Sequence, residues 1–175
     1  AVKLENQLLF IQEEPIDLST ISRIVVVGAG KAGAGMAAGL EKVLHGTNSF
    51  SGCIEGWINV PADCIRSLES IHLHAARPAG LNEPTQEGVR GSEQILQLVA
   101  SLDPTDLCIC LFSGGGSALL PAPVDGIELA DKQEVTQFLS AAGANIEQLN
   151  TVRKQLSTLK GGRLAAACHA NRLIS

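Results

Sequence analysis

Two apolar runs, each followed at once by glycines, constrain the fold of this chain more than any other feature. The first is "RIVVVGAG", residues 23–30, and the second is "LCICLFSGGG", residues 107–116. A short, continuous apolar run rich in β-branched residues is typical of a strand buried on both faces, as in a parallel sheet covered by helices. We therefore expect residues 24–28 and 107–112 to be central strands of one mostly parallel sheet.

The segments around these runs alternate between helical and strand patterns. Residues 31–45, 83–101 and 130–142 have helical patterns, and Gly143 stands where a helix C′ glycine belongs. "GCIEGWINVP" and "SIHLHAA" have strand patterns. The first 14 residues, "AVKLENQLLFIQEE", predict a short amphipathic helix with Leu4, Leu8 and Ile11 on one side. The alternation predicts a three-layer α/β/α, Rossmann-like domain.

Composition restricts the class of partner. The chain has 175 residues with a formal net charge of −5 and only 3% aromatic residues, which disfavours binding to nucleic acid. No apolar run is long enough to span a membrane, and no signal-like segment is present. Five cysteines, an odd number, favour a reducing compartment, so we expect a cytoplasmic protein. Cys108 and Cys110 share one face of a predicted strand, where small buried side chains are favoured over a metal pair because no second pair stands at ligand spacing.

The first glycine turn is a candidate anion site. Gly28, Gly30 and Gly33 match the G-x-G-x-x-G pattern that places a pyrophosphate at a helix N-terminus, and Lys31 stands inside it. A lysine ammonium is a mobile point charge that suits a phosphoryl group. A solvated lysine on a structurally required turn stays open as the alternative.

A dinucleotide is a poorer match to this turn. That fold needs an acidic residue about 20 positions further on to bind the ribose. Glu55 has nearly this spacing but falls inside a predicted strand, and Asp63 comes later. Neither carboxylate fits well.

The second glycine turn, Ser113–Ser117, is more specific. Three successive glycines, Gly114, Gly115 and Gly116, carry an entropic cost that a mere connection does not require. They let a ligand approach the main chain, and the hydroxyls of Ser113 and Ser117 flank it. A flexible tight turn is the alternative.

A third candidate lies in "ANIEQLNTVRKQLSTLKGG", residues 144–162. Asn145 and Gln148 stand in capping-box register at its start, and "KGG" ends or interrupts the predicted helix. One side of this helix is apolar, and the opposite side carries polar groups that could clamp a carboxylate or phosphate. The apolar residues are Ile146, Leu149, Val152, Leu156 and Leu159, and the polar ones are Asn150, Arg153, Lys154 and Ser157. A solvated basic face is the alternative unless this side faces the glycine turns.

Together these residues resemble the N-terminal domain of the type-2 glycerate kinases. The resemblance rests on "VVVGAGKAG", "LFSGGGSALLPAP", "LSAAGANIEQLNTVRKQLSTLKGGRLA" and, less closely, "RPAGLNEPTQEG", which span most of residues 24–166 in the family's order. One departure is that many members carry His-Pro before the long helix, where this chain has Arg77-Pro78. Arg77 is a further candidate for an anion contact.

The resemblance implies ATP-dependent phosphorylation of D-glycerate at its 2-hydroxyl, giving 2-phosphoglycerate, with Mg²⁺ whose ligands are not identifiable in the sequence. It implies that Lys31 and Arg153 are catalytic. It implies binding roles for Gly28, Gly30, Gly33, Ser113, Gly114, Gly115, Gly116, Ser117, Asn150, Lys154 and Lys160. D-glycerate and ATP are the expected small-molecule partners, and a homodimer is a further one.

The resemblance also implies that residues 1–175 are an incomplete N-terminal domain. A C-terminal domain of the MOFRL kind would be missing from this chain, and the fragment alone would then be inactive. Three other functions stay open, namely a phosphosugar-binding module of the isomerase type, a non-catalytic regulatory domain and an NAD-dependent hydroxypyruvate reductase. The isomerase type usually has an S-x-S-G-x-T loop, from which "FSGGGSALL" departs.

Overall fold

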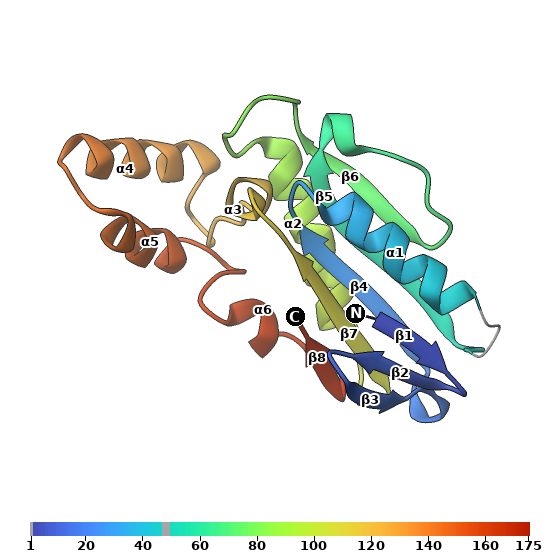
Figure 1. Cartoon of the computed structure of the whole chain (residues 1–175). Coiled ribbons are helices and arrows are strands. Elements are labelled where there is room, and N and C mark those ends of the chain that lie inside the picture. Colours follow the sequence, from blue (N-terminus) through green and yellow to red (C-terminus); the bar gives the residue numbers. More distant parts are fainter. Residues whose placement is uncertain (1, 47–49) are drawn as a thin grey trace.

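The computed structural model describes residues 2–46 and 50–175, and within them five parallel strands form the central sheet (Figure 1). The strand order is β6-β5-β4-β7-β8, and every neighbouring pair is parallel. Both strands predicted to be central, β4 and β7, lie inside the sheet. The strands are β4 (Arg23–Ala29), β5 (Cys53–Pro61), β6 (Ile71–Arg77), β7 (Asp106–Phe112) and β8 (Arg172–Ile174).

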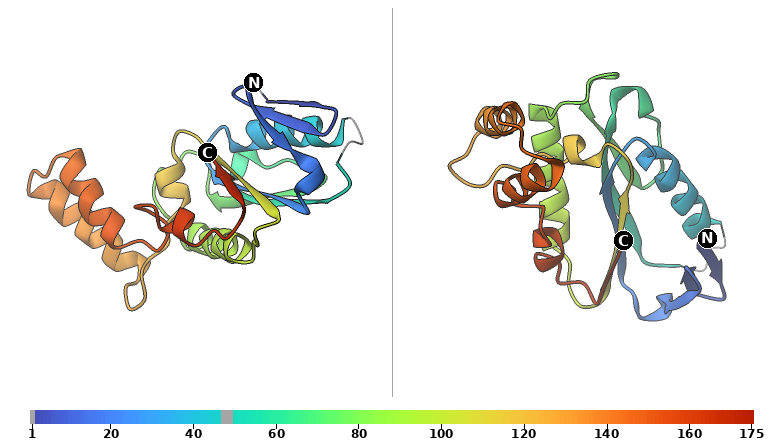
Figure 2. Two further views of the ribbon diagram at one scale, coloured as in Figure 1. Left: turned by 90° about the horizontal axis from the view of Figure 1, so that it is seen from below. Right: turned by 60° about the vertical axis from the view of Figure 1, so that its left-hand side comes forward.

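Helices cover both faces of this sheet, which confirms the three-layer α/β/α prediction (Figure 2). α1 packs on one face, and α2 and α6 lie on the other. Numbered in sequence order, the strands read 3-2-1-4-5 across the sheet. These are the first five strands of the dinucleotide-binding order 3-2-1-4-5-6, with the switch point between β4 and β7. The helices are α1 (Gly33–His45), α2 (Gln86–Ala100), α3 (Gly116–Leu119), α4 (Leu129–Ala141), α5 (Ile146–Gln155) and α6 (Arg163–Ala166), with 3₁₀ turns η1 (Leu18–Thr20) and η2 (Ala62–Cys64).

The helix predicted at the N-terminus is wrong, because this segment forms a separate antiparallel sheet of β1 (Val2–Glu5), β2 (Leu8–Ile11) and β3 (Glu14–Asp17). The two connecting turns are each made of two residues with positive φ, the conformation that matches the twist of a hairpin. Leu9 lies opposite both Leu4 and Ile16, and this column of three side chains is buried against the α1 side of the core. Burial of one face of the hairpins, with a period of two, therefore overrides the helical spacing.

α2 begins later than predicted, at a position set by its N-terminal cap. The helix begins at Gln86 rather than at residue 83, because Oγ1 of Thr85 accepts a hydrogen bond from the amide of Gly88 at 3.1 Å. Val89 and Val99 are buried, so the helix predicted at residues 83–101 is confirmed apart from its start.

The helix at residues 146–155 is shorter than predicted. Its capping box of Asn145 and Gln148 is confirmed, but the helix ends at Gln155, so the polar side predicted to continue to Ser157 does not exist as one helical face. The Arg163 guanidinium donates to the carbonyls of Lys154 at 2.9 Å, of Gln155 and of Ser157, and so satisfies the end of the helix. "KGG" forms the left-handed turn into α6 instead of the end of α5.

The two faces of the sheet bury separate apolar clusters. One unites β1–β3 with α1, and the other unites α2 with the region around α6. Cys108 and Cys110 lie in the second cluster, 0% and 5% exposed, which confirms that they are core side chains. The neighbouring Cys110 thiol and burial raise the pKa of Cys108, so this thiol stays protonated.

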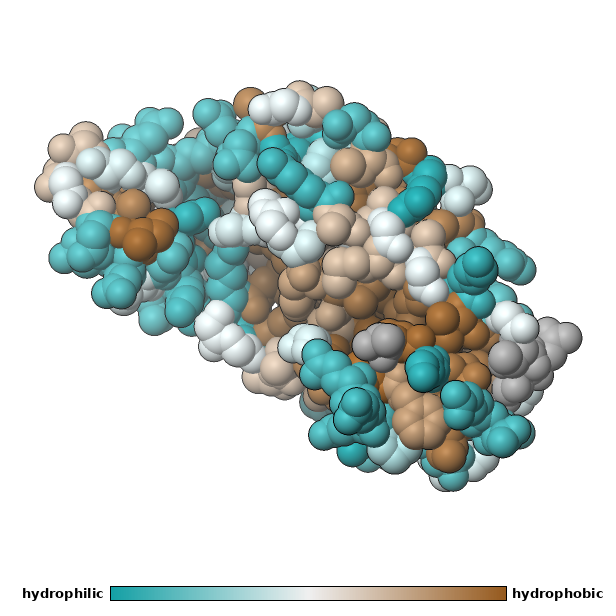
Figure 3. Space-filling model, viewed as in Figure 1, coloured by the Kyte–Doolittle hydropathy of each residue, from teal (hydrophilic) through white to brown (hydrophobic). Residues whose placement is uncertain are grey.

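α4 and α5 form an arm that extends away from the sheet (Figures 1 and 2). In Figure 3 this arm is mostly hydrophilic, with an isolated apolar area, and a larger apolar surface lies over the body of the domain. Phe138 on α4 and Ile146 on α5 are 70% and 64% exposed, so the side of α5 predicted to be apolar is not buried at its start. None of the helices in the described residues is both long enough and apolar enough to cross a membrane.

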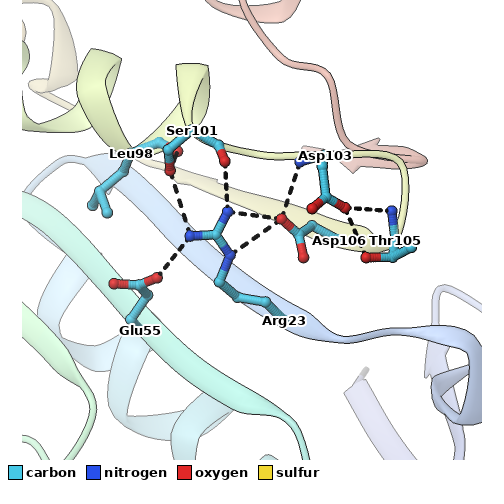
Figure 4. A network of polar contacts seen from close by, with 7 residues as sticks. All are labelled: Arg23, Glu55, Leu98, Ser101, Asp103, Thr105 and Asp106. Atoms are coloured by element: carbon cyan, nitrogen blue, oxygen red, sulfur yellow. Dashed lines mark hydrogen bonds and ion pairs between the residues drawn. The ribbon is translucent and has the colours of Figure 1, made fainter.

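A partly buried network around Arg23 ties three strands together at the edge of the sheet opposite the glycine turns (Figure 4). Arg23 on β4 donates to Asp106 on β7 at 2.7 and 3.1 Å, to Glu55 on β5 at 3.2 Å and to the Ser101 carbonyl after α2 at 2.8 Å. The hydrogen bond to Asp106 raises the pKa of Arg23 above its ordinary value. Because the Asp106 side chain is only 4% exposed, its charge depends on this partner.

Replacing Arg23 with glutamine should therefore destabilise the domain. We expect the free energy of unfolding to fall by about 2 kcal/mol, because Asp106 is left buried and its charge unneutralised. Urea unfolding of the protein with Arg23→Gln measures this. Arg90→Gln is the matched control, since Arg90 pairs with Glu87 on an exposed part of α2 and its loss should cost less than about 0.5 kcal/mol. Equal midpoints for the two variants would contradict the assignment.

Candidate functional site

The glycines of the first turn serve close packing. A Cβ on Gly28 would lie 2.0 Å from the Leu111 carbonyl oxygen of β7, and one on Gly33 would lie 2.9 Å from Ile58 on β5. Gly30 has a φ of +146°, and a Cβ there would lie 2.0 Å from Oγ of Ser113. At each of these three glycines, a neighbouring protein atom occupies the space that a side chain would need. The missing side chain at Gly30 lets the two glycine turns come into contact.

Three hydrogen bonds join the first turn to the second. The Ser113 amide donates to the Ala29 carbonyl at 3.1 Å, and the Lys31 amide donates to the Gly114 carbonyl at 3.0 Å. The Ser113 hydroxyl accepts from the amide of Ala32 at 3.0 Å, just before α1 begins. The Ser113 hydroxyl is therefore engaged within the fold, and the two turns form one unit at the switch point between β4 and β7.

The triple glycine combines a positive φ with an open surface. Gly115 has a φ of +84°, in the left-handed region, and it leads into α3. A Cβ on Gly114 would meet no atom within 4 Å, whereas one on Gly116 would lie 3.1 Å from the Ala29 carbonyl oxygen. The main chain at Gly114 can therefore be approached by a ligand, as the glycine pattern predicts.

Lys31 is exposed and lies beside the second turn. Its Cγ and Cε atoms lie 3.5 Å from the position that a Cβ on Gly115 would take. The ammonium group therefore lies next to the loop whose main chain is open. The structure thus brings together Lys31 and the Ser113–Ser117 loop, from the ends of two neighbouring strands.

Asn59, which sequence reasoning missed, holds this loop in place from β5. Its side chain is fully buried, and its Nδ2 donates to the Leu119 carbonyl at the end of α3 at 2.8 Å. Its Oδ1 accepts from the indole of Trp57 at 3.1 Å. An amide near the end of an otherwise apolar strand is the signal that could have identified it.

Arg153 and Lys160 reach the same loop from the other side. Nη2 of Arg153 and Nζ of Lys160 donate to the Ser117 hydroxyl at 3.1 and 2.8 Å. With both lone pairs of Ser117 occupied, its own hydrogen is free to be donated to a ligand. A cavity of about 510 Å³ opens here, and Lys132 of α4 lines it with Arg153, Lys160, Ser117 and Gly115.

The three cations of this cavity, Lys132, Arg153 and Lys160, which we call the cation pocket, repel one another in the absence of an anion. Burial, followed by the charges of Arg153 and Lys132, lowers the pKa of Lys160 to about 8. Burial and Arg153 likewise lower the pKa of Lys132. A bound anion would relieve this repulsion, so the cation pocket is suited to phosphate or carboxylate groups.

The remaining candidates of the third segment lie apart from the cavity. The Asn150 and Lys154 side chains are exposed on α5 and do not line the cavity, whereas Arg153, between them, does. Lys132 was missed because no spacing within α4 distinguishes it from a solvated lysine, and only the fold of the arm brings it to Ser117.

The described residues offer no ligand set for a metal. No group of three or more histidine, cysteine, aspartate or glutamate side chains in residues 2–46 and 50–175 is placed to hold an ion. Glu55, the weak candidate for a ribose contact, is engaged with Arg23 at the far edge of the sheet, and Asp63 is exposed in η2. The site on this chain is therefore cationic.

The fold and this site define a doubly wound α/β domain with a cationic anion site at its switch point. A family model described as "Domain of unknown function (DUF4147)" matches residues 1–175, and the chain belongs to this family. It is 38% identical over 163 residues to the glycerate kinases of Homo sapiens and Rattus norvegicus, covering 87% of this chain and 30% of each relative. It is 42% identical over 156 residues to an Agrobacterium vitis protein that carries the provisional name of a hydroxypyruvate reductase, covering 89% of this chain and 38% of the relative.

Two crystal structures have the same architecture. A Pyrococcus horikoshii protein aligns with a TM-score of 0.87 at 28% identity over 99% of this chain and 37% of its own. The Thermotoga maritima glycerate kinase aligns with a TM-score of 0.75 at 31% identity over 87% of this chain and 35% of its own. The resemblance to the N-terminal domain of the type-2 glycerate kinases is thereby confirmed. The chain spans 30% to 38% of the length of these relatives.

The lowered pKa of Lys160 predicts how anion binding depends on pH. Below about pH 8 Lys160 is charged and attracts an anion, and above it the charge is lost, so the affinity for sulfate should fall as the pH rises from 7 to 9. Sulfate itself keeps its charge throughout this range. Because a bound anion stabilises the charged lysine, the fall should be centred somewhat above the pKa of the free protein.

Isothermal titration calorimetry at pH 7, 8 and 9 measures this dependence. Lys160→Met should bind sulfate more weakly at pH 7 and show little change up to pH 9. Lys42→Met, an exposed lysine of α1, is the control and should behave as the unaltered protein does. A fall in affinity that persists unchanged in Lys160→Met would refute the assignment.

Proposed function

We propose that the protein is a glycerate kinase that transfers the γ-phosphoryl group of ATP to the 2-hydroxyl of D-glycerate. The observation that carries this proposal is the pair of cationic groups on either side of the Ser113–Ser117 loop, Lys31 on one and the cation pocket on the other. The similarity to glycerate kinases of animals and of Thermotoga maritima supports the same activity.

In this proposal the cation pocket holds the phosphates of ATP. Its volume of about 510 Å³ lies within the range of small-molecule sites, and Lys132, Arg153 and Lys160 neutralise negative charge while the Ser117 hydroxyl donates. The open main chain at Gly114 lets the terminal phosphate come close to the loop.

Lys31 would act on the phosphoryl group during transfer. The 2-hydroxyl oxygen forms a bond to the γ-phosphorus while the bond from that phosphorus to the bridging oxygen breaks, ADP leaves, and the hydroxyl proton is released. Phosphoryl transfer depends mainly on positioning and on neutralising charge. An exposed ammonium on a flexible stem can follow the group from donor to acceptor.

A divalent ion accompanies ATP in such reactions, but the residues described do not fit one. Three of the four charged residues that line the cavity are cations, and the one carboxylate, Glu83, stands alone there. We therefore assign no step on this chain to Mg²⁺. Groups on the rest of the protein and the phosphates themselves would hold it.

We further propose that residues 1–175 form the N-terminal part of a larger cytoplasmic enzyme that assembles as a homodimer. Its C-terminal domain, of the MOFRL kind, would close the site. The chain spans about a third of its relatives, 30% to 38%, which supports a site shared with residues beyond this domain.

A coupled ADP-release assay on the full-length protein tests the function. D-glycerate should give turnover with ATP, L-glycerate should give little, and the isolated 175-residue chain should give none. The name of the Agrobacterium vitis relative favours one second candidate, NAD-dependent reduction of hydroxypyruvate, so NADH oxidation with hydroxypyruvate is measured in parallel. Reductase activity without ADP release would overturn the kinase proposal, and turnover by the isolated chain would overturn the shared site.

Replacing Lys31 with methionine should slow transfer more than it weakens binding. Methionine keeps the length of the side chain and deletes its charge, and the turn itself depends on the glycines. Loss of a transition-state contact of this kind typically lowers kcat by about 10²–10³, with smaller changes in KM. Arginine at this position should rescue the rate only in part, because its planar group is larger and less mobile.

Steady-state kinetics on full-length Lys31→Met measure this effect, with a thermal melt to confirm folding. A folded variant with nearly unaltered kcat and kcat/KM would show that Lys31 has no part in catalysis.

A further inference from the structure

Arg77 is a buried cation at the same edge of the sheet as Lys31 and the second glycine turn. It is the last residue of β6, and it lies opposite Pro61 at the end of β5. The residue is only 4% exposed. Neither the packing of the core nor the cation pocket accounts for a guanidinium in this position.

Among residues 2–46 and 50–175, no carboxylate forms an ion pair with the Arg77 side chain. Its Nε atom is buried and has no hydrogen-bond partner among the described residues, and the ion pairs of those residues do not include Arg77. Arg23, a partly buried arginine of the same sheet, forms ion pairs with two carboxylates. Burying an arginine without such a partner is costly, so this guanidinium is available to an anion.

The guanidinium group points to the second glycine turn. The Nη2 atom of Arg77 lies 3.6 Å from the position that a Cβ on Gly115 would take, and Cε of Lys31 lies 3.5 Å from the same point. Two cations thus approach one glycine, and neither takes part in an ion pair among the described residues. Gly115 has no side chain to keep them from its main chain.

The two cations differ in a way that assigns them different ligands. Arg77 is fixed by burial, and its Nη2 faces the second glycine turn, where a guanidinium N–H can donate to a carboxylate oxygen. Lys31 is exposed, and its ammonium stands on a flexible stem. A fixed guanidinium suits the carboxylate, which does not move during transfer, and a flexible ammonium suits the group that does.

We propose that Arg77 binds the carboxylate of the acceptor substrate, a short 2-hydroxycarboxylic acid, while Lys31 contacts the phosphoryl group. The identity of the acceptor rests on the proposed glycerate kinase activity. Arg77 then holds the substrate so that its 2-hydroxyl, one carbon away from the carboxylate, faces Lys31 and the open main chain at Gly114. Because it binds the substrate alike before and during transfer, its loss should act mainly on KM.

The test compares the full-length protein with Arg77→Met in a buffer free of carboxylate and phosphate. Thermal midpoints are measured without ligand, with D-glycerate, with D-glyceraldehyde, which lacks the carboxylate, and with inorganic phosphate. We expect the variant without ligand to be at least as stable as the unaltered protein, because an unpaired buried charge is replaced by an apolar side chain of similar length. D-glycerate should raise the thermal midpoint of the unaltered protein and leave that of Arg77→Met unchanged. D-glyceraldehyde should raise the midpoint of neither protein. Phosphate should raise the midpoint of both, because it binds in the cation pocket.

Kinetics provide the second measurement. KM for D-glycerate should rise at least about tenfold in Arg77→Met, KM for ATP should stay within about twofold, and Arg77→Lys should recover part of the loss. Arg90→Gln, which removes an exposed arginine of α2, is the control and should change neither constant.

The proposal is overturned if Arg77→Met responds to D-glycerate as the unaltered protein does, or if it loses the response to phosphate instead. It is also overturned if Arg77→Met unfolds and Arg77→Lys binds D-glycerate with unaltered affinity, since the role is then structural. If the full-length protein shows no kinase activity, the proposed function fails, and the D-glycerate midpoints still decide whether Arg77 binds a carboxylate.

Discussion

The joining of the two glycine turns is the contact on which the rest of the site depends. Each turn follows a buried parallel strand, and the strands are neighbours, so their carboxyl ends meet at the switch point of the sheet. Gly30 leaves space for the Ser113 side chain, whose hydroxyl then binds the amide that precedes α1. The two helix starts and the two loops become a single rigid unit, and any larger side chain at Gly30 would force them apart.

This unit lies between two groups of cationic side chains. On one side, Lys31 and Arg77 approach Gly115, and on the other, Arg153 and Lys160 bind the hydroxyl of Ser117. The loop between them offers main chain rather than side chains. A phosphoryl group placed over the loop could therefore be reached from both sides, which is the arrangement that transfer between a nucleotide and a small acid requires.

The sequence revealed the strands of the site better than its side chains. Residues 23–29 and 106–112 could be predicted because burial on both faces demands continuous apolar runs, and glycines directly after such a run are typical of a strand that turns tightly into a helix. The N-terminal hairpins were missed because Gln7, Gln12 and Glu13 are not typical of left-handed turns. The burial that selects these hairpins is tertiary. The polar side at residues 150–157 was assigned from helical spacing alone, and the turn held by Arg163 removes it.

Site residues that lie far from the glycine turns in the sequence could not be predicted from local sequence patterns. Lys132 reaches the site only because α4 and α5 fold back together, and Arg77 could be noted but not assigned until its burial and missing partner were visible. The departure from the family's usual His-Pro at Arg77-Pro78 is the one sequence signal that marked this position. The cavity identifies Lys132, and the missing partner identifies Arg77; no motif identifies either.

A crystal structure of the full-length protein with a non-hydrolysable ATP analogue and D-glycerate tests the central claim most directly. The account predicts the terminal phosphate over Gly114, between Lys31 and Ser117, with the other phosphates among Lys132, Arg153 and Lys160. A nucleotide bound elsewhere, with Lys31 and the Ser113–Ser117 loop free of ligand, would contradict it.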